Sequence, residues 1–330
     1  MKDNKKEETR KLKVIVSSSP HIKDPLTTHT IMRLVFIALL PAAIWGVYEF
    51  GLYSGLILVT SIVTAILSEY LFEILTKKEI TISDGSAALT GLLFGMIISP
   101  TTPLWMVVIG SSSAIIIAKQ FFGGLGSNFL NPALFGRAVV FLSWTGLLNR
   151  WLKPGFNFFY FVSGSQNLVT TATPLDLFRL HQLNITPSLY SDLFFGRVGG
   201  SIGETSKLLL LIGVAFLLLV RRDIIDLKIP FTFIGTVTLL AFIFKQDVLF
   251  HLLSGGLIIG AFFMATDYVT SPVTPLGRVI FGIGAGVVTF VIRNWGIYPE
   301  GVSFGILSMN VLTPLFDKFL PKVFGTGGKK

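Results

Sequence analysis

Apolar runs of about bilayer-spanning length recur along most of the chain, separated by short polar breaks. A membrane-spanning helix needs about 20 mostly apolar residues. The run at 86–99 is short for a full crossing and is followed by Pro100, so we expect a tilted or broken helix there. The pattern predicts an all-α integral membrane protein of about ten helices, at residues 31–49, 52–75, 86–99, 103–120, 132–148, 206–220, 229–245, 248–266, 277–293 and 300–317.

A polar stretch rich in glycine, threonine and asparagine interrupts the apolar pattern after the fifth predicted helix. We therefore expect five regions: an N-terminal tail (1–30), a first five-helix unit (31–148), a loop (149–205), a second five-helix unit (206–320) and a C-terminal tail (321–330).

The two five-helix units share a short internal repeat. Ser99-Pro-Thr-Thr-Pro-Leu104 reappears as Ser271-Pro-Val-Thr-Pro-Leu276, and each copy lies between a glycine-punctuated apolar run and another predicted helix. Chance similarity between two membrane turns is the alternative to duplication. Because each unit has an odd number of helices, a duplicated second unit would enter the membrane the opposite way up, which predicts two inverted repeats.

Composition narrows the chemistry. Only 14% of the 330 residues are charged, against about a quarter in an average soluble domain. The absence of cysteine excludes disulfides, thiol catalysis and an iron–sulfur cluster held wholly by this chain. The four histidines are scattered without metal-ligand spacing, so we predict no metal site.

The net charge of +9 does not indicate nucleic-acid binding, because the charges lie at the ends of apolar runs, where they set orientation in a membrane. The basic N-terminal tail predicts cytoplasmic termini and an extracytoplasmic loop at 149–205. The loop itself is basic, but long translocated loops obey this rule weakly. Counting crossings then places these residues on the cytoplasmic side: Lys77, Lys78, Lys119, Arg221, Arg222, Lys228, Arg278, Lys318 and Lys322.

The predicted loop contains Asn167-Leu-Val-Thr-Thr-Ala-Thr173-Pro-Leu-Asp176. Taken alone, this segment favours a helix start, with Thr173 as the N-cap and Pro174 at the first helical position.

The same segment resembles the flavinylation motif of the family that contains the D subunit of the Rnf complex and the B subunit of the sodium-pumping NADH:quinone oxidoreductase. The family pattern is approximately Asp-x-x-Ser/Thr-Gly-Ala-Thr. The resemblance implies that its last threonine carries FMN through a phosphoester, installed by a flavin transferase that uses FAD. Thr170, Thr171, Ala172 and Thr173 match it, which makes Thr173 the acceptor. Asn167 and Thr171 depart from the pattern, at the positions of its Asp and Gly.

The resemblance covers roughly residues 30–320. It includes Asn131-Pro-Ala-Leu-Phe-Gly-Arg137, Phe263-Met-Ala-Thr-Asp-Tyr-Val-Thr-Ser-Pro272 and Thr274-Pro-Leu-Gly-Arg278. It suggests cofactor contacts for Arg137, Asp267 and Arg278, although each of these also suits a plain membrane-boundary residue.

What the resemblance implies is an electron-transfer subunit of a complex that couples electron transfer between ferredoxin and NAD to Na⁺ or H⁺ movement. The expected location is the cytoplasmic (inner) membrane of a prokaryote. The expected partners are other subunits, the flavin transferase and the lipid bilayer, and a second, non-covalent flavin (riboflavin) is implied. Two alternatives remain open: an inverted-repeat transporter or channel for a small solute, and a scaffold whose flavin site has decayed.

Overall fold

The computed structural model describes residues 27–155, 170–296 and 300–318. These residues are mostly helical, and the only strands among them are the antiparallel pair β1 (Trp151–Leu152) and β2 (Thr170–Thr171). Most of the two predicted tails, and Asn167 of the motif, lie outside the described residues.

The predicted helical ranges all contain helix. The first half comprises α1 (Thr28–Phe50), α2 (Leu52–Leu75), α3 (Ser86–Met96), α4 (Leu104–Ile116), α5 (Pro132–Ser143) and the short α6 (Thr145–Leu148). The second half comprises α9 (Lys207–Val220), α10 (Lys228–Ile243), α11 (Val248–Leu253), α12 (Leu257–Ile259), η4 (Gly260–Met264), α13 (Pro275–Trp295) and α14 (Gly301–Phe316).

Four helical segments are long and apolar enough to cross a membrane: Thr28–Phe50, Leu52–Leu75, Leu104–Phe122 and Pro275–Trp295. Several shorter apolar helices accompany them. The structure therefore agrees with an all-α membrane protein, while the count of ten crossings stays a prediction.

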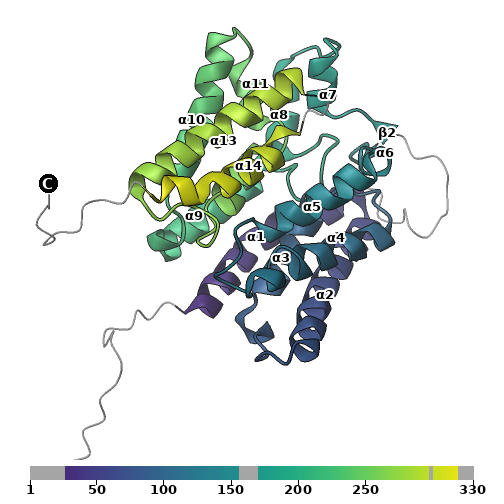
Figure 1. The fold of residues 1–330 in the computed structure, drawn as a ribbon. Helices are drawn as coiled ribbons and strands as arrows, with labels where there is room; N and C mark the ends of the chain where they lie inside the picture. The colour runs from purple at the N-terminus through teal and green to yellow at the C-terminus, as the bar shows by residue number, and fades with distance from the viewer. Residues whose placement is uncertain (1–26, 156–169, 297–299, 319–330) are drawn as a thin grey trace, which may run out of the picture.

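The two halves lie side by side (Figure 1) and share one hydrophobic core. Helix α2 packs on α3 and α4, and α4 packs on α5; in the second half α10 packs on α11 and α13, and α13 packs on α14. The halves meet through α1 against α9 and α5 against α14. This matched packing supports duplication, and the inverted relation of the halves stays a prediction.

The single helix predicted at 248–266 is wrong, because the chain breaks between α11 and α12. Gly255 has φ +59°, a left-handed conformation that favours glycine. The buried Arg293 guanidinium donates to two carbonyls at the break, from Nη1 to His251 O (2.7 Å) and from Nη2 to Ser254 O (3.0 Å). A break is tolerated at membrane depth where protein groups satisfy the freed backbone.

The end of the predicted loop is buried rather than solvated. Residues 200–206 pack between the halves, where Gly203 N donates to Met96 O (2.8 Å) and Ile202 N donates to Ile98 O (3.2 Å). These bonds satisfy carbonyls at the end of α3, which stops at Met96. A Cβ on Gly46 of α1 would lie 2.0 Å from Ile202 O, so only glycine admits this approach.

Candidate functional site

Thr173 begins a short helix, α7 (Pro174–Arg179), in the predicted loop. Its Oγ1 accepts from Asp176 N (3.1 Å) and donates to Asp176 Oδ2 (2.7 Å), and Thr173 N donates to the same Oδ2 (3.2 Å). This capping box satisfies free amides of the first turn. The helix-start interpretation of the motif is therefore confirmed, and it leaves the Thr173 side chain buried at 7% exposure.

Apolar contacts hold α7 against the second half of the molecule. Leu175 is buried in a cluster with Leu193 of α8 (Pro187–Phe195) and Phe250 of α11. Phe178 stacks on Phe250 with ring centroids 4.8 Å apart. A Cβ on Gly255 would lie 2.8 Å from Leu175 Cδ1, so α7 lies directly over the break between α11 and α12.

Two adjoining cavities of about 20 Å³ each lie near the start of α7, and Thr173 lines one of them. One is lined by Thr173, Thr205 and Lys207, the other by Arg137 and Arg293. Each is large enough for an ordered water. Both cavities share the lining residues Leu175, Glu204, Gly255 and Glu300.

The walls of these cavities carry three buried cations and two carboxylates. Arg137 pairs with Glu300 and donates to Ser303, while the Nη atoms of Arg293 serve the carbonyls at the helix break. Lys207 donates to the backbone carbonyl of Glu204. Three cations against two carboxylates leave one positive charge in excess.

Several buried donors around the cavities have no hydrogen-bond partner: Arg137 Nε, Arg293 Nε and Thr205 Oγ1. The first turns of α9 and α14 also line the cavities, and helix N-termini carry a partial positive charge and free amides. Donors, cations and helix ends together make these cavities suited to an anion.

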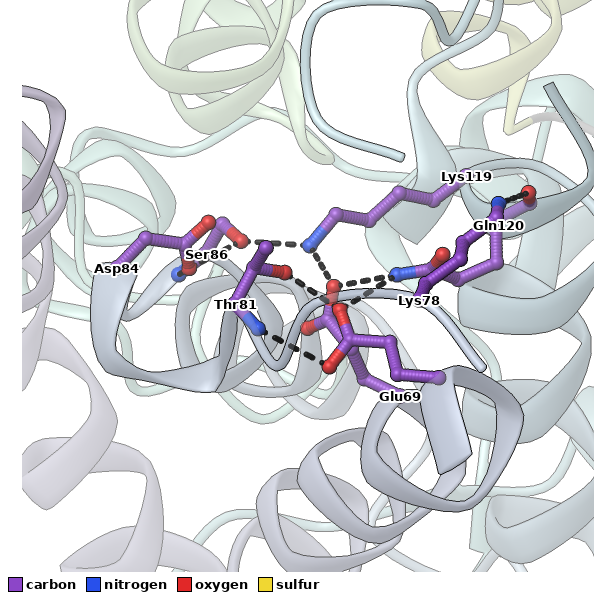
Figure 2. Close-up of polar contacts among 8 residues, drawn as sticks. Glu69, Lys78, Thr81, Asp84, Ser86, Lys119 and Gln120 are labelled. Atoms are coloured by element: carbon purple, nitrogen blue, oxygen red, sulfur yellow. Dashed lines mark hydrogen bonds and ion pairs between the residues drawn. The ribbon is translucent and has the colours of Figure 1, made fainter. Parts of the chain in front are cut away.

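A second polar cluster occupies the first half, at the ends of α2 and α4 and the start of α3 (Figure 2). Lys119 Nζ donates to Glu69 Oε1 (2.6 Å) and Ser86 Oγ (2.5 Å), and Gln120 Nε2 donates to the same Glu69 oxygen (2.7 Å). Lys119 and Glu69 are 1% and 0% exposed. The buried Lys119 ammonium is therefore paired with a carboxylate of the chain.

The other predicted cofactor residues lie away from Thr173. Asp267 lines a separate, mostly apolar cavity of about 90 Å³ at the interface of the halves and accepts from Thr270 Oγ1 (3.1 Å). Arg278 pairs with Asp226 beside an open polar groove of about 530 Å³. Of these candidates, only Arg137 lines a cavity that adjoins the one lined by Thr173.

Among the neighbouring motif residues, Thr170 and Thr171 form β2, opposite Leu152 and Trp151, and Ala172 is exposed. Arg179 ends α7 and lines neither cavity.

Sequence reasoning missed Glu204, Lys207 and Arg293. A signal existed for Arg293, because a cation within an apolar run is costly and marks a functional position. Lys207 was interpreted only as a loop charge, although it opens a run of apolar residues. No group of three or more His, Asp and Glu side chains placed to hold a metal occurs in the described part of the chain.

Comparison with known proteins gives concordant matches over nearly the whole chain. Residues 15–325 match the model of the NQR2, RnfD, RnfE family. The chain is 45% identical over 326 residues to the D subunit of the proton-translocating ferredoxin:NAD(+) oxidoreductase complex of Clostridium ljungdahlii, covering 94% of this chain and 96% of that protein.

Two further relatives widen the comparison. The D subunit of the Na(+)-translocating ferredoxin:NAD(+) oxidoreductase complex of Acetobacterium woodii is 44% identical over 310 residues, covering 93% of this chain and 94% of that protein. The D subunit of the ion-translocating oxidoreductase complex of Stutzerimonas stutzeri is 36% identical over 330 residues, covering 91% and 92%. Since two relatives of nearly equal similarity are named for different ions, similarity does not choose the ion.

Proposed function

The chain belongs to the NQR2, RnfD, RnfE family, and from that premise we propose that it is the flavin-carrying subunit of an ion-translocating ferredoxin:NAD⁺ oxidoreductase. In this role it is one part of a multi-subunit translocase and not a complete enzyme alone. Its FMN is esterified to Thr173, and its partners are the other subunits, the flavin transferase and the bilayer. The proposed location is the inner membrane of a prokaryote, with cytoplasmic termini and an extracytoplasmic flavin loop.

The observation that carries this proposal is the position of Thr173 at the edge of the over-positive cavities. A phosphodiester between Thr173 and the ribityl chain bears one negative charge. The three cations of the cavity walls can offset it, and Asp176 is the carboxylate that contacts the esterified oxygen. Its two unesterified oxygens are each close to a water in size, and the unpartnered donors Thr205 Oγ1 and Arg293 Nε are available nearby. The residues present therefore fit a phosphoryl group.

The cavities also limit where the rest of the cofactor lies. At about 20 Å³ each they are far below the 300–1,000 Å³ that ligand pockets occupy. The three-ring flavin must lie outside them, with its phosphate as the anchored end. The bound FMN supplies one- and two-electron transfer, and the protein's task is to attach, place and electrostatically support it.

Attachment changes the local hydrogen bonds. The ester replaces the hydroxyl hydrogen of Thr173, so the bond donated to Asp176 Oδ2 is lost. The bonds from Thr173 N to Asp176 Oδ2 and from Asp176 N to Thr173 Oγ1 do not need that hydrogen. Because the hydroxyl is buried and engaged, a transferase reaches it only when the start of α7 opens.

The implied riboflavin does not fit the cavity beside Asp267 as it stands. That cavity, at about 90 Å³, is several-fold smaller than a typical ligand pocket. Riboflavin therefore stays a family expectation without assigned contact residues, and cofactor contacts at Asp267 and Arg278 stay predictions.

In-gel fluorescence tests the covalent FMN directly. The chain is co-expressed with a flavin transferase, denatured in SDS and illuminated; wild type gives a fluorescent band and Thr173→Ala gives none. Thr173→Ser, which keeps a hydroxyl acceptor and a cap, is the matched control and retains some fluorescence. A dark wild-type band despite an active transferase contradicts the proposal, and a bright Thr173→Ala band moves the attachment elsewhere.

The transporter alternative has a separate test. Solute uptake into liposomes by the purified chain alone is expected under that alternative, and no such uptake is expected of a subunit that only carries electrons.

A further inference from the structure

Lys207 is a buried cation without an ion pair among the described residues, although the Glu204 carboxylate lines the same cavity. Its side chain is 2% exposed, and its ammonium donates to the Glu204 carbonyl. Among the described residues, no carboxylate lies within ion-pair distance of it, whereas Lys119, Arg137 and Arg278 each have one. The Glu204 carboxylate instead accepts from Ser201 N (3.4 Å).

We propose that Lys207 is the counter-charge and positioning residue for the phosphoryl group on Thr173. The inference rests on the proposed attachment of FMN at that residue and adds the group that fixes its anionic end. Lys207 and Thr173 line the same cavity, together with the unpartnered Thr205 hydroxyl. The geometry thus offers one ammonium and one hydroxyl to a phosphate esterified at the cavity edge.

The physical argument concerns the cost of an unmatched buried charge. Removing an ion from water is expensive, and the cost is recovered only when an opposite charge and good hydrogen bonds replace the water. One carbonyl bond leaves two of the three ammonium hydrogens of Lys207 for other partners. A phosphodiester supplies both the missing charge and the missing acceptors.

The fold explains why the lysine is held in place without an ion pair. Ser206 caps α9, with its Oγ accepting from Leu209 N (3.4 Å), so Lys207 is the first residue of that helix. The preceding residues 200–206 are fixed by their backbone bonds to the end of α3. The backbone of Lys207 is therefore fixed in position, and the residue is buried from solvent.

Lys119 provides a matched control. It is also a buried lysine, but its ammonium is paired with Glu69, and it does not line the cavity that Thr173 lines. If the stability effect of flavin attachment depends on Lys207 and not on Lys119, the dependence is specific to the site and not a general property of buried lysines.

The test is a thermodynamic cycle on the full chain in detergent, with and without FMN attached by the transferase. The melting temperature is measured for wild type, Lys207→Met and Lys119→Met in both states, and the FMN load is read by in-gel fluorescence. We expect attachment to raise the melting temperature of wild type more than that of Lys207→Met. Without FMN, Lys207→Met should melt at or above wild type, because an unmatched charge has been removed.

Lys119→Met should lower the melting temperature by the same amount in both states. Equal gains on attachment in wild type and Lys207→Met, with both bands fluorescent, overturn the role of Lys207 and leave the attachment intact. A dark wild-type band instead overturns the attachment itself.

A second readout covers the case in which Lys207→Met does not fold. Lys207→Arg keeps the positive charge, and Lys207→Gln keeps a polar group without it. Iodide quenching of the attached flavin should increase severalfold in Lys207→Gln relative to wild type and much less in Lys207→Arg, because a loosely held phosphate frees the cofactor. Identical quenching in all three proteins contradicts the proposal.

Discussion

The two buried lysines of this molecule have opposite environments. Lys119, in the first half, donates to Glu69 and Ser86, and the Gln120 amide donates to the same Glu69 oxygen, so the lysine has a carboxylate partner inside the chain (Figure 2). Lys207, the first residue of α9, donates to the Glu204 carbonyl and lines a cavity. The first lysine has a carboxylate within ion-pair distance, whereas the second has none among the described residues and lines a cavity with the unpartnered Thr205 hydroxyl.

The largest effect should come from removing the Lys119 cation from its ion pair with Glu69. Lys119→Met leaves the Glu69 carboxylate buried without its cation and should cost about 3–5 kcal/mol of unfolding free energy. Thermal or denaturant unfolding in detergent measures it. The double variant Lys119→Met with Glu69→Leu should recover most of the loss, since both charges are then gone. A small loss in the single variant would mean that water reaches this cluster.

The next largest effects should come from two glycines where backbones approach closely, one near Lys207 and one in the first half. Gly46→Ala places a Cβ 2.0 Å from Ile202 O, and Gly91→Ala places one 2.7 Å from Ser61 O. Each should cost about 1–3 kcal/mol through overpacking, measured by melting temperature.

The two variants should differ in their effect on the stability gained when flavin is attached. Gly46→Ala displaces the loop that precedes Lys207, so it should also reduce the stability gained on flavin attachment. Gly91→Ala disturbs α2 against α3 and should leave that gain unchanged. Equal effects of both variants on the gain would show that the two clusters are coupled through the core.

A smaller effect is expected at the capping box. Asp176→Ala removes the acceptor for Thr173 N and Oγ and should cost about 0.5–2 kcal/mol, seen as faster hydrogen exchange at the start of α7. Asp176→Asn keeps an acceptor oxygen and is the control. The cluster around Lys119 should exchange as in wild type, and a change there would argue against local opening.

The smallest effect should come from a half-exposed ion pair. Partial burial opposes the charged form of Asp226, but the amide of Lys228 and the Arg278 guanidinium outweigh it and hold the pKa of Asp226 below its usual value. A lowered folded pKa stabilises the fold above the unfolded pKa, and this contribution is lost as pH falls through the folded pKa.

Asp226→Asn should therefore cost about 0–1 kcal/mol at neutral pH, as is typical of exposed pairs. The difference in melting temperature from wild type should vanish under acidic conditions. A loss that persists at low pH would assign Asp226 a role beyond its charge.

Sequence patterns predicted the helical segments, the short α3 and the capping role of Thr173, because apolar periodicity and cap chemistry are local. They did not predict the break at Gly255, which depends on the Arg293 guanidinium arriving from α13. Nor did they place Lys207 under Thr173, since the two residues meet only after α7 docks on α11.

The family resemblance supplied the acceptor residue, and geometry supplied its surroundings. Arg137, Asp267 and Arg278 were each predicted as cofactor contacts; Arg137 lines a cavity adjoining the one lined by Thr173, whereas Asp267 and Arg278 line two other cavities. Charges that share a motif or a boundary position need not share a site.

Under the proposed attachment of FMN, the buried hydroxyl of Thr173 has a consequence for the order of biogenesis. An acceptor sealed by its own helix cap can be modified before α7 docks, or afterwards only during transient excursions from the native state. Once docking is complete, the rate of labelling reports the frequency of those excursions. Maturation then acts as a checkpoint in assembly: a chain that closes too early remains colourless, and one that closes late is loaded first.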